Sequence, residues 1–103
     1  AKEAPHLRDA FVEKALMEYE LENYKSVEDL CFKALEIKSH EKTYINEPFS
    51  WDSTIYDLLS ISAYHLQRYS QAIYFVDIAL TYLPNDERLL NNRKIFKEKE
   101  SSF

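Results

Sequence analysis

The strongest constraint on the fold is an internal repeat with a spacing of 45 residues. When the chain is shifted by 45 positions against itself, bulky residues fall on bulky residues and small ones on small ones. The matched positions follow the spacing of one face of an α-helix and not that of a strand. We therefore expect two copies of one helical unit. The matched pairs are Phe11/Tyr56, Leu16/Ile61, Tyr19/Tyr64, Leu21/Leu66, Tyr24/Tyr69, Leu30/Phe75, Cys31/Val76, Ala34/Ala79 and Leu35/Leu80.

Each copy fits a unit of about 34 residues, which leaves an insertion at 42–52, expected to be irregular or briefly extended. Helices are predicted over 6–22, 25–38, 53–67, 70–83 and 86–100, and the first four form two antiparallel pairs. The chain, 1–103, is then one all-α domain. Its parts are a repeat at 8–41, the insertion at 42–52, a repeat at 53–86 and a capping helix at 87–100.

Several residues have the character of helix ends. Pro5 suits a first helical turn, where its missing N–H costs nothing. Asp52 or Ser53 is expected to cap the third helix, and Asp86 the fifth. Pro84 should end the fourth, because the residue before a proline disfavours helical geometry.

The last predicted helix has one apolar stripe, formed by Leu89, Leu90 and Phe96 with Arg93 among them. Its other positions carry Lys, Glu and Asn. A terminal helix with one apolar side and one polar side is what a short repeat array needs at its end. We therefore expect this helix to cover the second pair.

The chain contains no glycine. Loops that cradle phosphates need glycine so that the backbone can approach the phosphate closely, so the P-loop and the dinucleotide fingerprint are both excluded. The net charge is −5 without a basic block, which disfavours nucleic-acid binding. No apolar run is long enough to cross a bilayer, so no membrane is expected as a partner.

Residues that could carry metal or nucleophilic chemistry are few and scattered. His6, His40 and His65 lack metal-ligand spacing, so neither a metal nor a cofactor is expected. The single Cys31 lies among apolar residues and is interpreted as a small packed side chain. A cysteine that has no partner within the chain fits a reducing, cytoplasmic setting.

Both copies carry the residue types of one known repeat pattern, at Tyr56, Leu59, Leu66, Tyr69, Ala72, Ile73, Ala79, Leu80 and Pro84 in the second copy and at Tyr24, Ala34 and Leu35 in the first. On these residues the chain resembles the tetratricopeptide repeat (TPR), which implies an α–α superhelix. It also departs from that pattern: Tyr19 and Tyr64 come one place later than usual, and Ser60 and Gln67 replace usual glycines. The first copy matches less well, because Lys14 and Glu18 occupy usually apolar positions and Ser39 stands where proline is expected.

The TPR resemblance also implies a concave groove lined by the first helix of each pair. Members that clamp the carboxylate tail of a chaperone place Lys, Arg and Asn in this groove, and this chain has none there. An acidic and apolar groove favours a basic or amphipathic partner. Alternatively, these are merely exposed polar residues. The implied groove positions are Asp9, Val12, Glu13, Leu16 and Glu20 in copy one and Thr54, Asp57, Leu58, Ile61 and His65 in copy two.

The insertion is aromatic, so Phe49 and Trp51 are expected either to fill the gap between the pairs or to form a contact surface. Three segments carry a narrower resemblance: Tyr-Ile-Asn-Glu-Pro-Phe-Ser-Trp at 44–51, Tyr-Asp-Leu-Leu-Ser-Ile-Ser-Ala-Tyr at 56–64 and Leu-Pro-Asn-Asp-Glu-Arg-Leu-Leu-Asn-Asn at 83–92. Through them residues 44–96 resemble the helical-repeat region that follows the catalytic domain in some bacterial family 2 glycosyltransferases. The Asp-x-Asp metal motif of such enzymes is absent from the sequence. If the resemblance holds, it implies that this is the non-catalytic part.

Two functions follow. The first is a non-catalytic interaction or scaffold domain, the C-terminal accessory region of a bacterial glycosyltransferase that aids acceptor binding or dimerisation. The alternative is a free-standing TPR adaptor that binds a basic or amphipathic peptide in its groove. A small hydrolase or transferase in its own right is the weakest reading, because no catalytic constellation is evident. The partner is expected to be a protein or a neighbouring domain, and a homo-oligomer is compatible with both functions.

Overall fold

A computed structural model describes residues 3–36 and 51–102, without the side chains of 3–9, 51 and 52. These residues form five α-helices and no strand, so the prediction of an all-α fold is confirmed. Each observed helix begins and ends within three residues of its predicted bounds. The helices are α1 (Glu3–Glu20), α2 (Tyr24–Glu36), α3 (Trp51–His65), α4 (Tyr69–Tyr82) and α5 (Glu87–Ser101).

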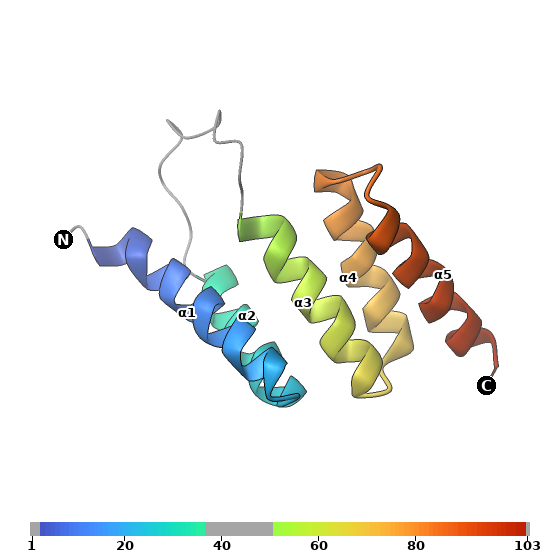
Figure 1. Ribbon diagram of the computed structural model, residues 1–103, viewed down its shortest axis with the longest axis horizontal. Helices are drawn as coiled ribbons and strands as arrows, with labels where there is room; N and C mark the ends of the chain where they lie inside the picture. The colour runs from blue at the N-terminus through green and yellow to red at the C-terminus, as the bar shows by residue number, and fades with distance from the viewer. Residues whose placement is uncertain (1–2, 37–50, 103) are drawn as a thin grey trace.

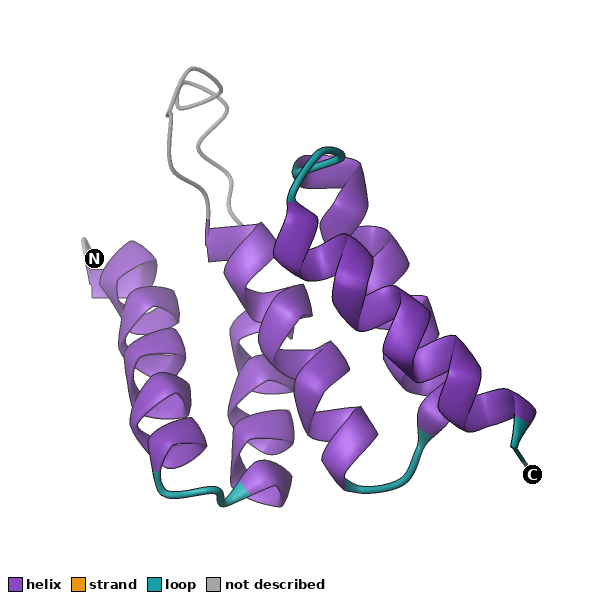
Figure 2. Cartoon of the chain, turned by 45° about the vertical axis from the view of Figure 1, so that its right-hand side comes forward, coloured by secondary structure: helices purple, strands orange, loops and turns teal. Residues whose placement is uncertain are grey.

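The helices pack in chain order. α1 packs on α2 and α3 on α4, while α2 contacts α3 and α4 contacts α5. α1 also contacts α3 directly. Figure 1 shows the result, an array with α1 at one end and α5 at the other. Figure 2 shows that, apart from short turns, the described chain is helical throughout.

The core consists of two clusters of buried side chains. The first includes Val12, Val27 and Leu59, and so draws on α1, α2 and α3. The second includes Val76 and Leu89 and joins α3 and α4 to α5. Repeat-related positions are equivalent in the structure, because Cys31 with Val76 and Ala34 with Ala79 are all fully buried. Half-buried Tyr56 packs against both clusters.

The turns within the two helix pairs share one geometry, which glycine would normally adopt. Glu22 and Gln67 both have left-handed backbone angles, with φ of 63° and 66°. Gln67 stands where the TPR pattern has glycine, and Glu22 is its counterpart 45 residues earlier. In both turns the following N–H donates to a carbonyl five residues back, which satisfies the helix end in a Schellman arrangement. These bonds are Asn23 N to Glu18 O, 2.9 Å, and Arg68 N to Ala63 O, 2.8 Å.

The ends of α4 and α5 follow the sequence closely. α4 ends at Tyr82, two residues before Pro84. The Asp86 side chain accepts a hydrogen bond from the Leu89 backbone N–H at 3.0 Å, so the predicted cap of α5 is confirmed. The predicted cap of α3 is wrong: the helix begins at Trp51, so Asp52 and Ser53 lie inside its first turn. Acidic and hydroxyl residues favour a first turn as well as a cap, and the sequence does not separate the two.

The capping role of α5 is only partly as predicted. Leu89 and Phe96 are buried in the second cluster, but Leu90 is 45% exposed. The prediction for Leu90 was wrong: Leu90 lies about 100° around the helix from Leu89, on the side away from the second cluster. Polar contacts complete the attachment of α5 to the rest of the array. They are Arg93 Nε to Asp77 Oδ1, 2.6 Å, Ser70 Oγ to Glu100 Oε2, 2.6 Å, and the pair between Arg88 and Asp57.

The left-handed turns generate the first prediction. A side chain at a left-handed position costs about 1–2 kcal/mol, and glycine removes that cost while adding some unfolded-state entropy. We expect Gln67→Gly to raise the free energy of unfolding by about 0.5–1 kcal/mol. Gln67→Ala keeps a Cβ atom and should give no such gain. Urea denaturation measures both, and a glycine variant no more stable than the alanine variant would contradict the strain at this turn.

The second prediction compares two apolar residues of α5, one buried and one exposed. Phe96 is 3% exposed, and replacing a buried Phe by Ala costs about 3–5 kcal/mol. Phe96→Ala or deletion after Asn85 should therefore leave the protein poorly soluble or partly unfolded. Leu90→Ala is the matched control on the exposed side and should change stability by no more than about 0.5 kcal/mol. Thermal unfolding at the wild-type temperature in Phe96→Ala would refute the capping role.

Candidate interaction surface

The groove residues predicted from the sequence lie on two neighbouring helices. α1 and α3 contact each other and run side by side in Figure 1. Positions three to four residues apart lie on one side of a helix. The side formed by both helices is called the α1/α3 face below. Its residues are Glu13, Leu16 and Glu20 on α1 and Asp57, Ile61 and His65 on α3.

The α1/α3 face has an apolar strip with acidic flanks. Leu16 and Ile61 are half-buried, so part of each side chain is available to a partner. Glu13 and Glu20 are exposed on the α1 side. His65 is exposed near the end of α3.

Some residues expected in the groove are elsewhere. Val12 is fully buried and Leu58 is 5% exposed, so both belong to the core. They were misassigned because an inner helix of an array must bury one side while it presents another, and the two sides adjoin. The side chains of Asp9 and Trp51, and all of Phe49, lie outside the described part of the chain. Thr54 is half-buried on α3.

The charge of Asp57 is already engaged within the protein. Its carboxylate pairs with the Arg88 guanidinium of α5, Nη1 lying 3.3 Å from Oδ1 and Nη2 bonding Oδ2. The hydrogen bond that Arg88 donates to Asp57 raises the pKa of Arg88. Burial acts in the opposite direction, and the charges of Asp57, Asp86 and Tyr19 add smaller increases. The sequence interpretation missed Arg88. Carrying the 34-residue period forward from Thr54 leads to position 88, so the repeat itself marks Arg88 as the next groove position.

Aromatic rings connect the turn ends of the array. Tyr24 of α2 and His65 of α3 stack with ring centroids 4.1 Å apart and planes 7° apart. Burial raises the pKa of the Tyr24 hydroxyl, and Glu22 and Tyr19 add to the shift. Tyr64 continues the series at 5.3 Å from His65 and 5.1 Å from Phe96. One face of the His65 ring is therefore covered by Tyr24 of α2.

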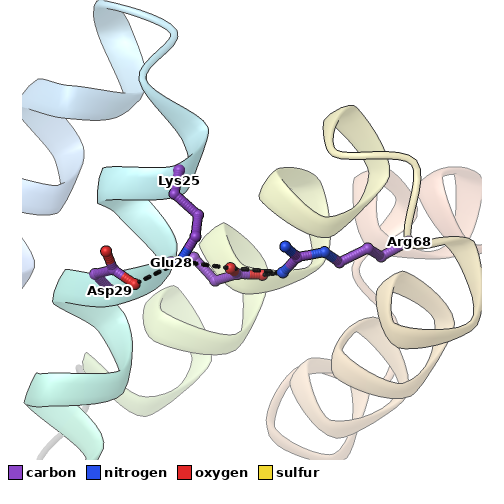
Figure 3. A network of polar contacts seen from close by, with 4 residues as sticks. All are labelled: Lys25, Glu28, Asp29 and Arg68. Carbon is purple, nitrogen blue, oxygen red and sulfur yellow. Dashed lines mark hydrogen bonds and ion pairs between the residues drawn. The ribbon is translucent and has the colours of Figure 1, made fainter.

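A buried ion pair lies beside this stack and joins the two repeats (Figure 3). Arg68 Nη1 lies 2.7 Å from both carboxylate oxygens of Glu28. The Glu28 side chain is 3% exposed and that of Arg68 42%. Lys25 lies further off, 3.8 Å from Glu28, and bonds Asp29 at 3.0 Å. Because Glu28 is withdrawn from solvent, the pair is a structural joint and not a binding site.

The Cys, His, Asp and Glu side chains bear on any metal or nucleophilic chemistry. Among the side chains of residues 10–36 and 53–102, no three His, Cys, Asp or Glu are grouped so that they could hold a metal ion. Cys31 is fully buried, and burial raises the pKa of its thiol to about 12, with Glu28 adding to the shift. A thiol with so high a pKa is a poor nucleophile at neutral pH. None of the described helices is both long and apolar enough to cross a membrane.

The chain was also compared with known proteins. It matched no protein-family model, no curated protein and no solved structure. The resemblances to the TPR and to the glycosyltransferase repeat region therefore rest on the residues quoted above.

The ion pair between Glu28 and Arg68 generates the third prediction. Arg68→Ala leaves a buried carboxylate without its partner, and we expect a loss of about 1.5–3 kcal/mol in the free energy of unfolding. Lys25→Ala removes the exposed pair with Asp29 and only the longer 3.8 Å contact with Glu28, so it should cost less, no more than about 1 kcal/mol. Urea denaturation compares the two.

The double variant Glu28→Leu/Arg68→Ala provides the decisive control. Removing both charges removes the desolvation penalty as well. It should be more stable than Arg68→Ala alone. If adding Glu28→Leu instead lowers the free energy of unfolding below that of Arg68→Ala, the unpaired carboxylate was not the source of the instability.

Proposed function

We propose that this chain is a non-catalytic interaction module, and that its α1/α3 face binds a basic, amphipathic segment of a protein partner. The proposal rests mainly on one observation: exposed Glu13 and Glu20 flank half-buried Leu16 and Ile61. Apolar side chains of the partner would cover the strip, and its Lys or Arg residues would meet the flanking carboxylates. Charge complementarity of this kind sets specificity and association rate more than affinity.

The ion pair of Arg88 supports a positive charge on the partner segment. An unpaired Arg88 of α5 would attract an acidic segment to the neighbouring α1/α3 face, but its charge is paired with that of Asp57. The charges left for a partner are those of the two glutamates on α1. The face as a whole therefore favours a positively charged segment.

The module can serve in two settings. As the accessory region of a larger glycosyltransferase, it would hold an acceptor, a neighbouring domain or another subunit. As a free-standing adaptor, it would bind a peptide directly. The resemblance over residues 44–96 favours the first setting, while the α1/α3 face serves both. In either setting we propose that the isolated chain neither binds nor hydrolyses a nucleotide sugar.

The fourth prediction tests the face with a defined probe. A fluorescein-labelled helical peptide with Leu on one side and Lys on the other should bind the full chain. Added salt should weaken this binding, because exposed charges are screened. The same peptide with Glu in place of Lys should bind at least tenfold more weakly. Fluorescence anisotropy measures both.

Ile61→Lys is the most informative variant, because it removes apolar contact and adds the wrong charge. It should weaken binding of the Lys peptide at least tenfold. Tyr74→Lys adds the same charge on α4, at a side chain 63% exposed, and should leave binding nearly unchanged. Asp57 is unsuited to this test because its reversal would set two cations together at Arg88. Equal losses in both variants, or binding of a nucleotide sugar with metal, would overturn the proposal.

A further inference from the structure

The outer sides of α1 and α5 lie at opposite ends of the array (Figure 1). At the α1 end, Met17 is 64% and Leu21 66% exposed, the two most exposed among the large apolar side chains that the structure describes. At the α5 end, Leu90 is 45% exposed and lies in a shallow open hollow with Lys94 and Lys97. Each end therefore has apolar area that a second molecule could cover.

The outer side of α1 is flanked by two opposite charges. Glu13 and Lys14 are consecutive, and both are exposed. Because consecutive residues of a helix point about 100° apart, they stand about 50° to either side of a common line. Met17 and Leu21 follow within about 30° of this line. These four residues are called the outer α1 surface below.

The α5 hollow has the same construction with the charges exchanged. Its lining includes Leu90, Lys94, Lys97 and Glu98. Lys97 and Glu98 are consecutive, so they also stand to either side of a common line, with Leu90 and Lys94 near it. Here the cation comes first and the anion second, whereas on α1 the anion comes first. The two surfaces are therefore candidates for contact with each other.

Antiparallel packing of α1 of one copy on α5 of another brings opposite charges together. Two antiparallel helices in contact keep each flank on its own side, so the first residue of one consecutive pair faces the first residue of the other. Glu13 then faces Lys97, and Lys14 faces Glu98. None of these four side chains forms an ion pair with another residue that the structure describes. Both flanks are thus attractive, and their charges are available.

The same register aligns the apolar residues. At about 1.5 Å per residue, Leu21 lies about 6 Å beyond Met17, and Leu90 lies about 6 Å before Lys94. When Met17 is placed opposite Lys94, the reversal of direction brings Leu21 to the height of Leu90. Met17 then covers the aliphatic stem of Lys94. In this register the two charge pairs also agree in height to within about 1.5 Å.

We propose that copies of this chain associate head to tail, with the outer α1 surface of one copy seated antiparallel on the α5 hollow of the next. The contact joins two different surfaces, so it is heterologous and each added copy leaves one free end of each kind. This self-association goes beyond the peptide binding proposed for the α1/α3 face and does not depend on it.

The size of the contact fixes its expected strength. One helix against one helix is at the small end of specific interfaces, which bury about 1,200–2,000 Å² in total when they are stable. The association should therefore be reversible, with a dissociation constant on the order of 0.1 mM. Wild type should form dimers and larger species as its concentration rises.

Sedimentation equilibrium of the full chain tests the proposal with two blocked variants. Met17→Lys places a second cation opposite Lys94 and blocks the α1 end. Leu90→Glu removes the apolar contact with Leu21 and blocks the α5 end. Each variant alone should associate at least tenfold more weakly than wild type. An equimolar mixture should recover dimers and stop there, because one intact outer α1 surface meets one intact hollow and no second contact is possible.

Three results would overturn the head-to-tail contact. The first is association of Leu90→Glu at the wild-type level, which would show that the hollow is not used. The second is a mixture no more associated than the single variants. The third is a wild-type protein that stays monomeric at about 1 mM, a concentration about ten times the expected dissociation constant.

A charge swap tests the register itself. Glu13→Lys and Lys97→Glu should each weaken association about three- to tenfold, because like charges then meet. The double variant Glu13→Lys/Lys97→Glu should restore association, and a double variant no better than the single ones would refute the register. Lys33→Glu makes the same charge reversal at an exposed position of α2 and should associate like wild type.

Two further measurements keep this test separate from that of the proposed function. All the substituted positions at the two ends are exposed, so thermal unfolding should stay near that of wild type. Leu90→Glu should still bind the Lys peptide, and Ile61→Lys should still associate head to tail. Loss of peptide binding in Leu90→Glu, or of association in Ile61→Lys, would show that the two surfaces had been wrongly separated.

Discussion

The packing of α2 on α3 is the interaction on which the whole array depends, because it joins the two helix pairs. At this junction Glu28 is buried and must keep its contact with Arg68. Replacing such a pair with apolar residues is often neutral, whereas removing one partner is costly. In another register of α2 on α3 the carboxylate would be buried without Arg68, so we expect the pair to disfavour such registers. The stack of Tyr24 on His65 fixes the same junction from the turn side.

Much of the fold could be predicted because the repeat constrains both copies at once. A helix assignment in one copy had to agree with its counterpart 45 residues away, and this agreement located the helix ends closely. The exceptions are local. Glutamate is not a residue type that favours a left-handed backbone, so the conformation of Glu22 could not be predicted from its identity. Only its equivalence to Gln67 in the repeat indicates it. Leu90 was misassigned because two consecutive leucines both look like core residues in a sequence. In the helix Leu89 is buried, whereas Leu90 lies on the exposed side.

The candidate site was harder to predict because it depends on which charges remain available. Sequence spacing places Asp57 on the same side of α3 as Ile61, but it does not reveal the guanidinium that reaches it from α5. Likewise the sequence around Glu28 predicts an ordinary surface acid, and only the structure shows its contact with Arg68, 40 residues later. Long side chains from distant segments determine these pairings. Periodicity gives the direction of a side chain, and only the packed structure gives its partner.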